Sequence, residues 1–153
     1  MRTMPSILLR IGLLLGGAAL LGAFSDLSRD QLKLLQDPGG WEYIKLTDNG
    51  IQTEHVCFDG QPHPDICRGR ITLSTDNQFA QDVTIQGQTV SRHGTYTLED
   101  DQLAFFDEFG TRDGPYTIEL DSHAKSLVMY TPQVRIELIL EKTLRSKKRK
   151  ESK

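Results

Sequence analysis

Apolar and polar side chains alternate along most of the chain from Trp41 onward. The clearest example is residues 134–141, where a valine, an isoleucine and two leucines at the even positions are separated mainly by charged residues. Residues 116–121 alternate in the same way, with apolar side chains at every second position. A period of two is typical of a strand that turns one face to a core and the other to water.

Short segments with this period follow one another, separated by turn residues. Turns such as Asp48-Asn49-Gly50 and Thr131-Pro132 come roughly every 8–12 residues, the spacing typical of antiparallel sandwiches and barrels. No predicted helix there is long enough for a parallel crossover, and closing the sheet would remove its exposed edges. We therefore expect an all-β fold, a small antiparallel up-and-down barrel of about eight strands, with a sandwich as the alternative. The predicted strands are residues 41–46, 51–58, 70–74, 78–85, 89–91, 94–98, 102–106, 116–121, 126–130 and 134–141.

One short helix is predicted before the barrel. Ser28 and Gln31 have the spacing of a capping box, and Leu32 and Leu35 then fall on one helical face. The sequence Asp37-Pro38-Gly39-Gly40 ends the helix, because proline cannot continue it and glycine releases the chain. We expect this helix to cover one end of the barrel.

The first 25 residues have the pattern of a secretory signal peptide. Arg2 and Arg10 precede an uncharged run over residues 11–24, which at ~1.5 Å per residue is shorter than a ~30 Å hydrocarbon core. The best cleavage site is Ala23-Phe24-Ser25. We predict a secreted or periplasmic protein, and membrane attachment only if this segment stays uncleaved and residues 7–9 extend the span.

In an oxidising compartment, Cys57 and Cys67 are expected to form a disulfide around the nine-residue loop 58–66. The alternative is a metal site that includes His55 and His63, but the spacing matches no zinc pattern, so no metal is predicted.

The chain ends in a basic segment, residues 142–153, with seven Lys/Arg and one Glu. Residues 26–141 are acidic by contrast, with nine basic and twenty acidic side chains and a formal net charge of −11. Like charges at this density repel, which predicts a disordered tail, either merely solvated or in contact with an anionic envelope surface. Export argues against nucleic acid as a partner. We divide the chain into a signal peptide (1–25), a short helix and linker (26–40), the barrel (41–141) and this tail.

Two segments resemble the calycin group of barrels, which includes lipocalins and streptavidin. Gly39-Gly40-Trp41 resembles the Gly-x-Trp that opens those barrels, where the Trp plugs one end. Residues 92–116, with Gly94-x-Tyr96, Phe105-Phe106-Asp107-Glu108, Gly110 and Asp113-Gly114, are similar to a family of small bacterial streptavidin-like barrels of unassigned function. The resemblance implies an eight-stranded barrel with an interior pocket, and no known ligand or chemistry.

Aromatic residues are the candidates for lining such a pocket, although each could equally fill a core. The candidate ligand-binding residues are Trp41, Tyr43, Tyr96, Phe105 and Tyr116. Asp107, Glu108 and Asp113 are expected in a rim loop over the mouth; with Asp100 and Asp101 they could form a calcium site, but Asp and Gly are also what hairpin turns need.

We expect an exported barrel that binds a small apolar or amphipathic molecule. The alternative is an envelope protein-binding module, similar to an inhibitor, that uses the loop held by Cys57 and Cys67. No nucleophile motif, metal quartet or phosphate loop is found in the sequence, so a binding protein without a cofactor is favoured over an enzyme.

Overall fold

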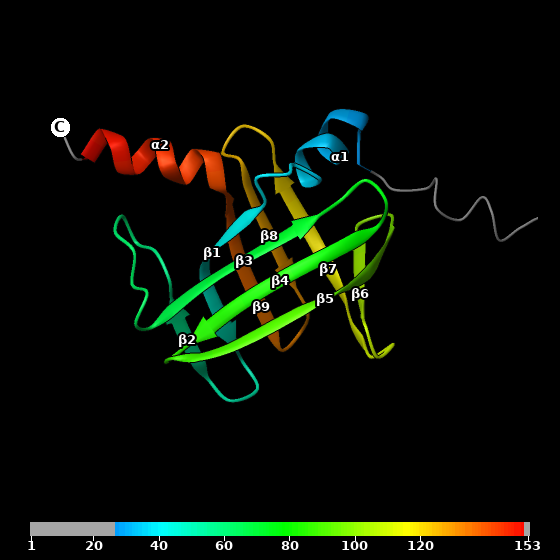
Figure 1. Cartoon of the computed structure of the whole chain (residues 1–153), viewed down its shortest axis with the longest axis horizontal. Coiled ribbons are helices and arrows are strands. Elements are labelled where there is room, and N and C mark those ends of the chain that lie inside the picture. The colour runs from blue at the N-terminus through cyan, green and yellow to red at the C-terminus, as the bar shows by residue number, and fades with distance from the viewer. Residues whose placement is uncertain (1–26, 152–153) are drawn as a thin grey trace, which may run out of the picture.

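The computed structural model of the chain describes residues 27–151, and the predicted signal peptide lies outside this range. Helix α1 (Arg29–Leu35) comes first, nine strands follow, and helix α2 (Glu141–Glu151) comes last (Figure 1). The strands are β1 (Trp41–Asp48), β2 (Thr53–Val56), β3 (Cys67–Leu73), β4 (Gln78–Ile85), β5 (Gln88–Glu99), β6 (Gln102–Asp107), β7 (Arg112–Asp121), β8 (Ser126–Tyr130) and β9 (Val134–Leu140).

The strands form a closed antiparallel barrel, which confirms the predicted fold class. Neighbours in the sheet follow chain order from β3 to β9, and β1 pairs with β9 over almost its whole length to close the ring. Strand β2 pairs only with β1 among the described strands, so it lies outside the ring of eight. Alternate residues of each strand point inward, and the inward positions of β3 and β9 are almost all apolar and buried.

Helix α1 plugs one end of the barrel, as the sequence predicts. Ser28 accepts a hydrogen bond from the backbone of Gln31, and the Gln31 side chain accepts one from the backbone of Ser28, so the predicted capping box is present. Leu35 is wholly buried in the core, and the indole Nε1 of Trp41 donates to its carbonyl oxygen at 3.0 Å. We call this the plugged end, and the opposite end the mouth.

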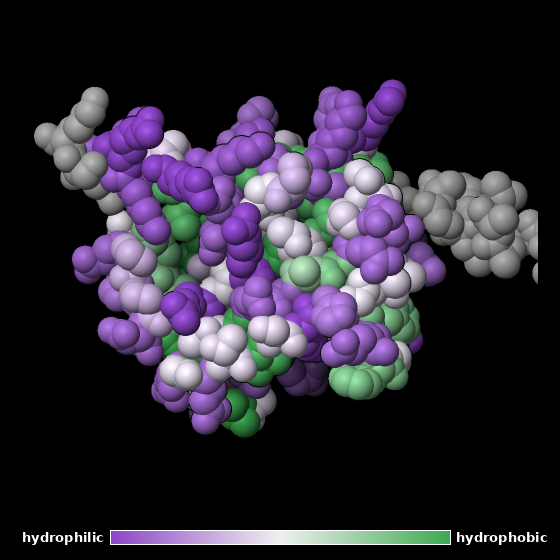
Figure 2. All heavy atoms as spheres, in the orientation of Figure 1, coloured by the Kyte–Doolittle hydropathy of each residue, from purple (hydrophilic) through white to green (hydrophobic). Residues whose placement is uncertain are grey.

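The prediction of a disordered tail over residues 142–153 is wrong as far as Glu151, because α2 begins directly where β9 ends. Lysine, arginine and glutamate are good helix formers, and Leu144 gives the helix one buried apolar contact with the barrel. Lys142 forms an ion pair with Asp37 at 3.0 Å, and the backbone N–H of Glu141 donates to the carbonyl of Gly40. Hydrophilic side chains cover this helix on the face seen in Figure 2. Neither α1 nor α2 is long and apolar enough to span a membrane.

Several predicted strand boundaries also differ from the structure, most of all those of β5 and β7. Residues 89–91 and 94–98 belong to one continuous strand, β5, because Gly94 does not break it but allows a close approach: a Cβ there would lie 2.0 Å from the carbonyl oxygen of Phe106 on β6. Strand β7 begins at Arg112, earlier than the predicted start at residue 116, and its register with β6 shifts between Leu103 and Phe105. This bulge decides where Asp113 points, as described below.

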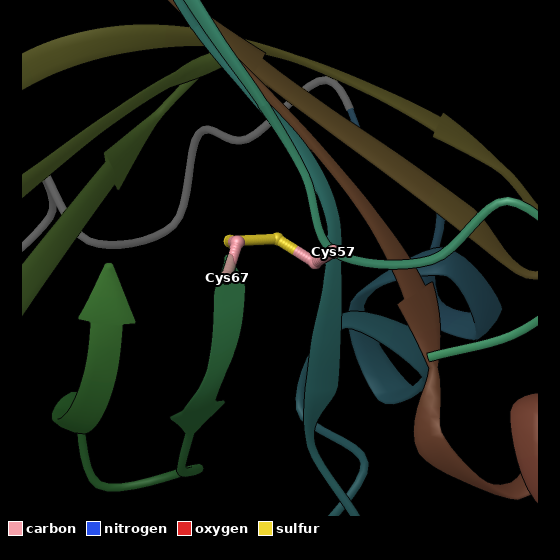
Figure 3. Close-up of a disulfide and its surroundings, with 2 residues drawn as sticks. All are labelled: Cys57 and Cys67. Carbon is pink, nitrogen blue, oxygen red and sulfur yellow. A yellow bond between two sulfur atoms is a disulfide. The ribbon is translucent and has the colours of Figure 1, made fainter. Parts of the chain in front are cut away.

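The weakest point of the ring is the seam between β1 and β3. Only Trp41 and Glu42 of β1 pair with β3, after which the same edge of β1 pairs with β2 instead. At the changeover, the carbonyl of Ile44 accepts hydrogen bonds from the backbone N–H groups of Cys57 and Phe58. The predicted disulfide is present and joins the end of β2 to the first residue of β3 across this seam (Figure 3).

Because the disulfide joins two segments with so few shared hydrogen bonds, replacing both cysteines with serine should destabilise the fold. The chain-entropy model for cysteines 10 residues apart gives a loss of about 2.5–3 kcal/mol in the free energy of unfolding. Urea unfolding of the wild type and of C57S/C67S measures this difference. Reductant should lower the free energy of unfolding of the wild type to that of the variant and leave the variant unchanged. Equal free energies for the oxidised wild type and the variant would contradict the prediction.

Candidate functional site

Three of the five predicted ligand-binding aromatics are packed in the plugged half of the barrel. Trp41 contacts α1 as described, and the ring of Phe105 packs against Phe79 with 4.9 Å between centroids. The hydroxyl of Tyr96 donates to the carbonyl of Ser74 at 2.8 Å and accepts from the Gln36 side chain at 2.7 Å. These contacts give Trp41, Tyr96 and Phe105 a role in holding the plug and filling the core.

The other two aromatics, Tyr43 and Tyr116, flank a polar network in the half of the barrel nearer the mouth. Arg92 is its centre: Nε donates to Oε1 of Gln81 at 3.1 Å, and Nη2 donates to Oδ2 of Asp113 at 2.6 Å. The Tyr116 hydroxyl donates to Oδ1 of Asp113 at 2.7 Å, and Nε2 of Gln81 donates to the hydroxyl of Tyr43. We call these five residues the mouth network; they come from β1, β4, β5 and β7.

The strand registers place these polar side chains on the inner face. Gln81 on β4 lies directly opposite Arg92 on β5, two positions along from the buried Phe79. Asp113 lies opposite the buried Phe105. Asp113 and Tyr116 are three residues apart, so in a regular strand they would face opposite sides, and the bulge in β7 turns both inward.

The mouth network is reachable from solvent and has unused hydrogen-bond donors. The side chains of Arg92 and Asp113 are 29% and 32% exposed. A guanidinium carries five N–H donors, and only two of those on Arg92 are used by contacts among residues 27–151. The Tyr43 hydroxyl accepts from Gln81, and its own O–H has no acceptor in the described part of the chain. The hydrogen-bonding groups of Arg92 and Tyr43 that stay unpaired within the described residues are therefore donors.

Both phenols stay protonated at neutral pH. Burial raises the pKa of Tyr43 to about 12, against smaller opposing effects of the Gln81 hydrogen bond and the Arg92 charge. Burial also raises the pKa of Tyr116, and its hydrogen bond to the Asp113 carboxylate raises it further. Tyr43 can therefore donate a hydrogen bond over the whole physiological range.

Apolar side chains are exposed around the mouth. Ile51 in the β1–β2 turn is 71% exposed, Val90 near the start of β5 is 59% exposed, and Phe109 in the β6–β7 turn is 84% exposed. Figure 2 shows hydrophobic atoms at the lower edge of the molecule, over the β1–β2 and β6–β7 turns. The strand order places all three turns or strand ends at the mouth, opposite α1. We call these three residues the apolar rim.

The predicted rim-loop acids have three separate roles. The Asp107 carboxylate accepts from the backbone N–H groups of Phe109 at 3.0 Å and Thr111 at 2.8 Å, which fixes the turn. Glu108 pairs with His93 at 3.1 Å on the surface, and Asp113 lies inside the barrel in the mouth network.

Neither metal alternative fits the structure. Asp100 and Asp101 lie in the β5–β6 turn at the plugged end, so the five acids considered for calcium are not together. Within residues 27–151 no group of three or more His, Cys, Asp or Glu side chains is placed to hold a metal ion. Both cysteine sulfurs are in the disulfide, which rules out their use as zinc thiolates.

A second feature is a cleft of about 210 Å³ beside the seam. Phe58, Pro62 and Pro64 of the disulfide loop and Leu144 and Lys148 of α2 line it. Tyr43 lines it as well, and its ring packs against the backbone of Gly69, where a Cβ would lie only 2.9 Å away. Tyr43 thus connects this cleft with the mouth network.

Sequence reasoning missed Gln81 and Arg92, the middle of the network. Dividing β5 into two short strands left Arg92 between them with no assigned face. The signal that could have found them is a polar residue at an inward position, since Gln81 follows Phe79 by two residues and pairs with Arg92 once β5 is continuous.

Comparison with known proteins gives no relative from which to assign the site: no family model, curated protein or solved structure matches the chain.

The raised pKa of Tyr43 predicts a loss of stability in alkali. In the unfolded chain a tyrosine ionises near pH 10, whereas Tyr43 in the fold ionises near 12, so the unfolded state releases its proton first as the pH rises. Between pH 10 and 11 this should lower the free energy of unfolding by about 1 kcal/mol. Urea unfolding of wild type and Y43F at both pH values should show a shallower pH dependence in Y43F. Equal slopes would mean that Tyr43 is not protected from ionisation.

Proposed function

We propose that this protein binds one small amphipathic molecule at the mouth of its barrel. The observation that carries the proposal is the mouth network: five polar or aromatic side chains that point inward from four strands, with an Arg92–Asp113 ion pair partly open to solvent. A barrel needs no such pair to stay folded, because apolar residues of similar volume stabilise an interior as well or better. Binding of a ligand would explain why the Arg92–Asp113 ion pair is retained.

The polar end of the proposed ligand carries a hydrogen-bond acceptor. The free donors of Arg92 and the O–H of Tyr43 fit a carboxylate, sulfonate or carbonyl oxygen, and guanidinium groups bind such oxygens with strong, directional hydrogen bonds. The Asp113 carboxylate already balances the charge of Arg92, so a carbonyl would satisfy the site as well as an anion.

The rest of the ligand is apolar and lies toward the mouth. The plugged half is filled by Trp41, Phe105 and their neighbours, which sets the depth of entry, and the apolar rim offers Ile51, Val90 and Phe109 at the entrance. Ligand sites in proteins commonly combine a mainly apolar lining with a few placed polar groups. Disulfides persist in oxidising compartments, so the Cys57–Cys67 bridge supports the proposal that the protein acts in the envelope or outside the cell.

Two fluorescent probes test the proposal. 1-Anilinonaphthalene-8-sulfonate has an apolar body with an acceptor head, and N-phenyl-1-naphthylamine has nearly the same body without the head. We expect the wild type to bind the sulfonate probe at one site and more tightly than the amine. In R92M/D113L, which removes both charges together and so leaves none unpaired, the preference should fall about tenfold or more.

The matched control is H93A/E108A, which removes an exposed ion pair on the outer face of the barrel. His93 is the residue after Arg92 on β5, so the change is made next to the network but on the opposite face. It should leave both affinities unchanged. Unaltered sulfonate binding in R92M/D113L, or no binding of either probe to the wild type, would count against the proposal.

A second candidate function is protein binding through the disulfide loop. The loop is held rigid by a β-bridge between Phe58 and Pro62 and by an Asp59–His63 contact at 2.8 Å, and it presents an exposed Ile66. With α2 it borders the 210 Å³ cleft, large enough for one partner side chain. A rigid loop binds with little loss of entropy.

Capture from envelope extract on immobilised wild type and I66D separates this function from the first. Loss of a captured protein in I66D, but not in R92M/D113L, would support the loop as a binding element. If wild type and I66D captured an identical set of proteins, the result would argue against binding through the loop.

A further inference from the structure

Helix α2 concentrates positive charge at one place on an acidic protein. Six of its residues are basic and every one of their side chains is exposed, whereas Leu144 and Glu141 are buried. The basic residues are Lys142, Arg145, Lys147, Lys148, Arg149 and Lys150. The residues from 26 to 141, by contrast, have a formal net charge of −11.

Internal pairing uses only part of this charge. Lys142 pairs with Asp37, and Arg145 pairs with Glu141 one turn earlier. Lys147, Lys148 and Lys150 form no hydrogen bond or ion pair with any residue in the range 27–151, although the charge of Lys148 acts on Glu42 beside the cleft. Three lysines in the last two turns of the helix are therefore available to an external anion.

Both ends of the described chain lie at the plugged end. The structure begins at Leu27, next to α1, and α2 starts where β9 reaches the same end, tied there by the Lys142–Asp37 pair (Figure 1). The 26 residues that precede Leu27 include the uncharged run 11–24. The start of the described chain and the basic helix thus lie at one end of the barrel, and the mouth lies at the other.

We infer that α2 docks on an anionic lipid surface, with the plugged end toward the bilayer and the mouth facing away. A cluster of basic residues on an exposed helix is a pattern that binds anionic headgroups, and each lysine near such a surface adds to the affinity. The one well-buried apolar side chain of α2, Leu144, faces the barrel, so the helix lies on the headgroups by charge attraction and does not insert. This orientation is independent of the proposed ligand and leaves the mouth open to it.

Vesicle sedimentation of the full chain tests this inference. Phosphatidylcholine vesicles with and without phosphatidylglycerol separate charge attraction from apolar insertion. An apolar run left uncleaved would bind both kinds of vesicle, whereas α2 would bind only the anionic kind. We expect the wild type to favour the anionic vesicles, and K147Q/K148Q/K150Q to lose about 100-fold of that preference. Raising the salt concentration should weaken wild-type binding to the anionic vesicles.

The matched control is K45Q/R112Q/R135Q, which removes three positive charges from the parts of β1, β7 and β9 nearer the mouth and should keep the preference. Thermal melting of both variants verifies that each is folded. Equal preference in wild type and K147Q/K148Q/K150Q would overturn the inference, as would binding to double-stranded DNA without binding to anionic vesicles.

Discussion

The closure of the barrel depends on the short seam between β1 and β3. Two residue pairs join these strands, whereas seven join β3 to β4 and eight join β4 to β5. The disulfide supplies the missing connection by tying β2, which takes over the edge of β1, to the start of β3. Tyr43 directly follows Glu42, the last residue of β1 that pairs with β3, so the position of its hydroxyl in the mouth network depends on this closure.

The two ends of the barrel have different physical characters. The plugged end is closed by α1, which is held by hydrogen bonds of Trp41 and Tyr96. Phe105 fills the space beneath it. Toward the mouth, the inner face changes to Gln81, Arg92 and Asp113, and the apolar side chains move outward to the rim. This change from a polar interior to an apolar rim is the arrangement on which the proposed ligand site rests.

The barrel, the helix before it and the disulfide could be predicted from the sequence because each leaves a local signal. Alternation marks strands, Ser28 and Gln31 mark a helix start, and two nearby cysteines after an apolar leader mark a bridge. The mouth network left no such signal, because Gln81, Arg92 and Asp113 are brought together only by the register of three hairpins and a bulge. The helix α2 was missed because charge density alone suggested disorder, while one leucine and two ion pairs were enough to order it.

Strand β2 has a consequence beyond closing the seam. It pairs on one side only among the described strands, so every second residue of this four-residue strand presents backbone N–H and C=O groups that another chain could pair with. Its shortness and the polar side chains of Glu54 and His55 discourage such pairing while the disulfide fixes the neighbouring β3. Reduction would release the end of β2 from β3, and its unpaired edge would then be easier for another chain to reach. The Cys57–Cys67 bridge therefore limits pairing of this edge with other chains as well as stabilising the fold.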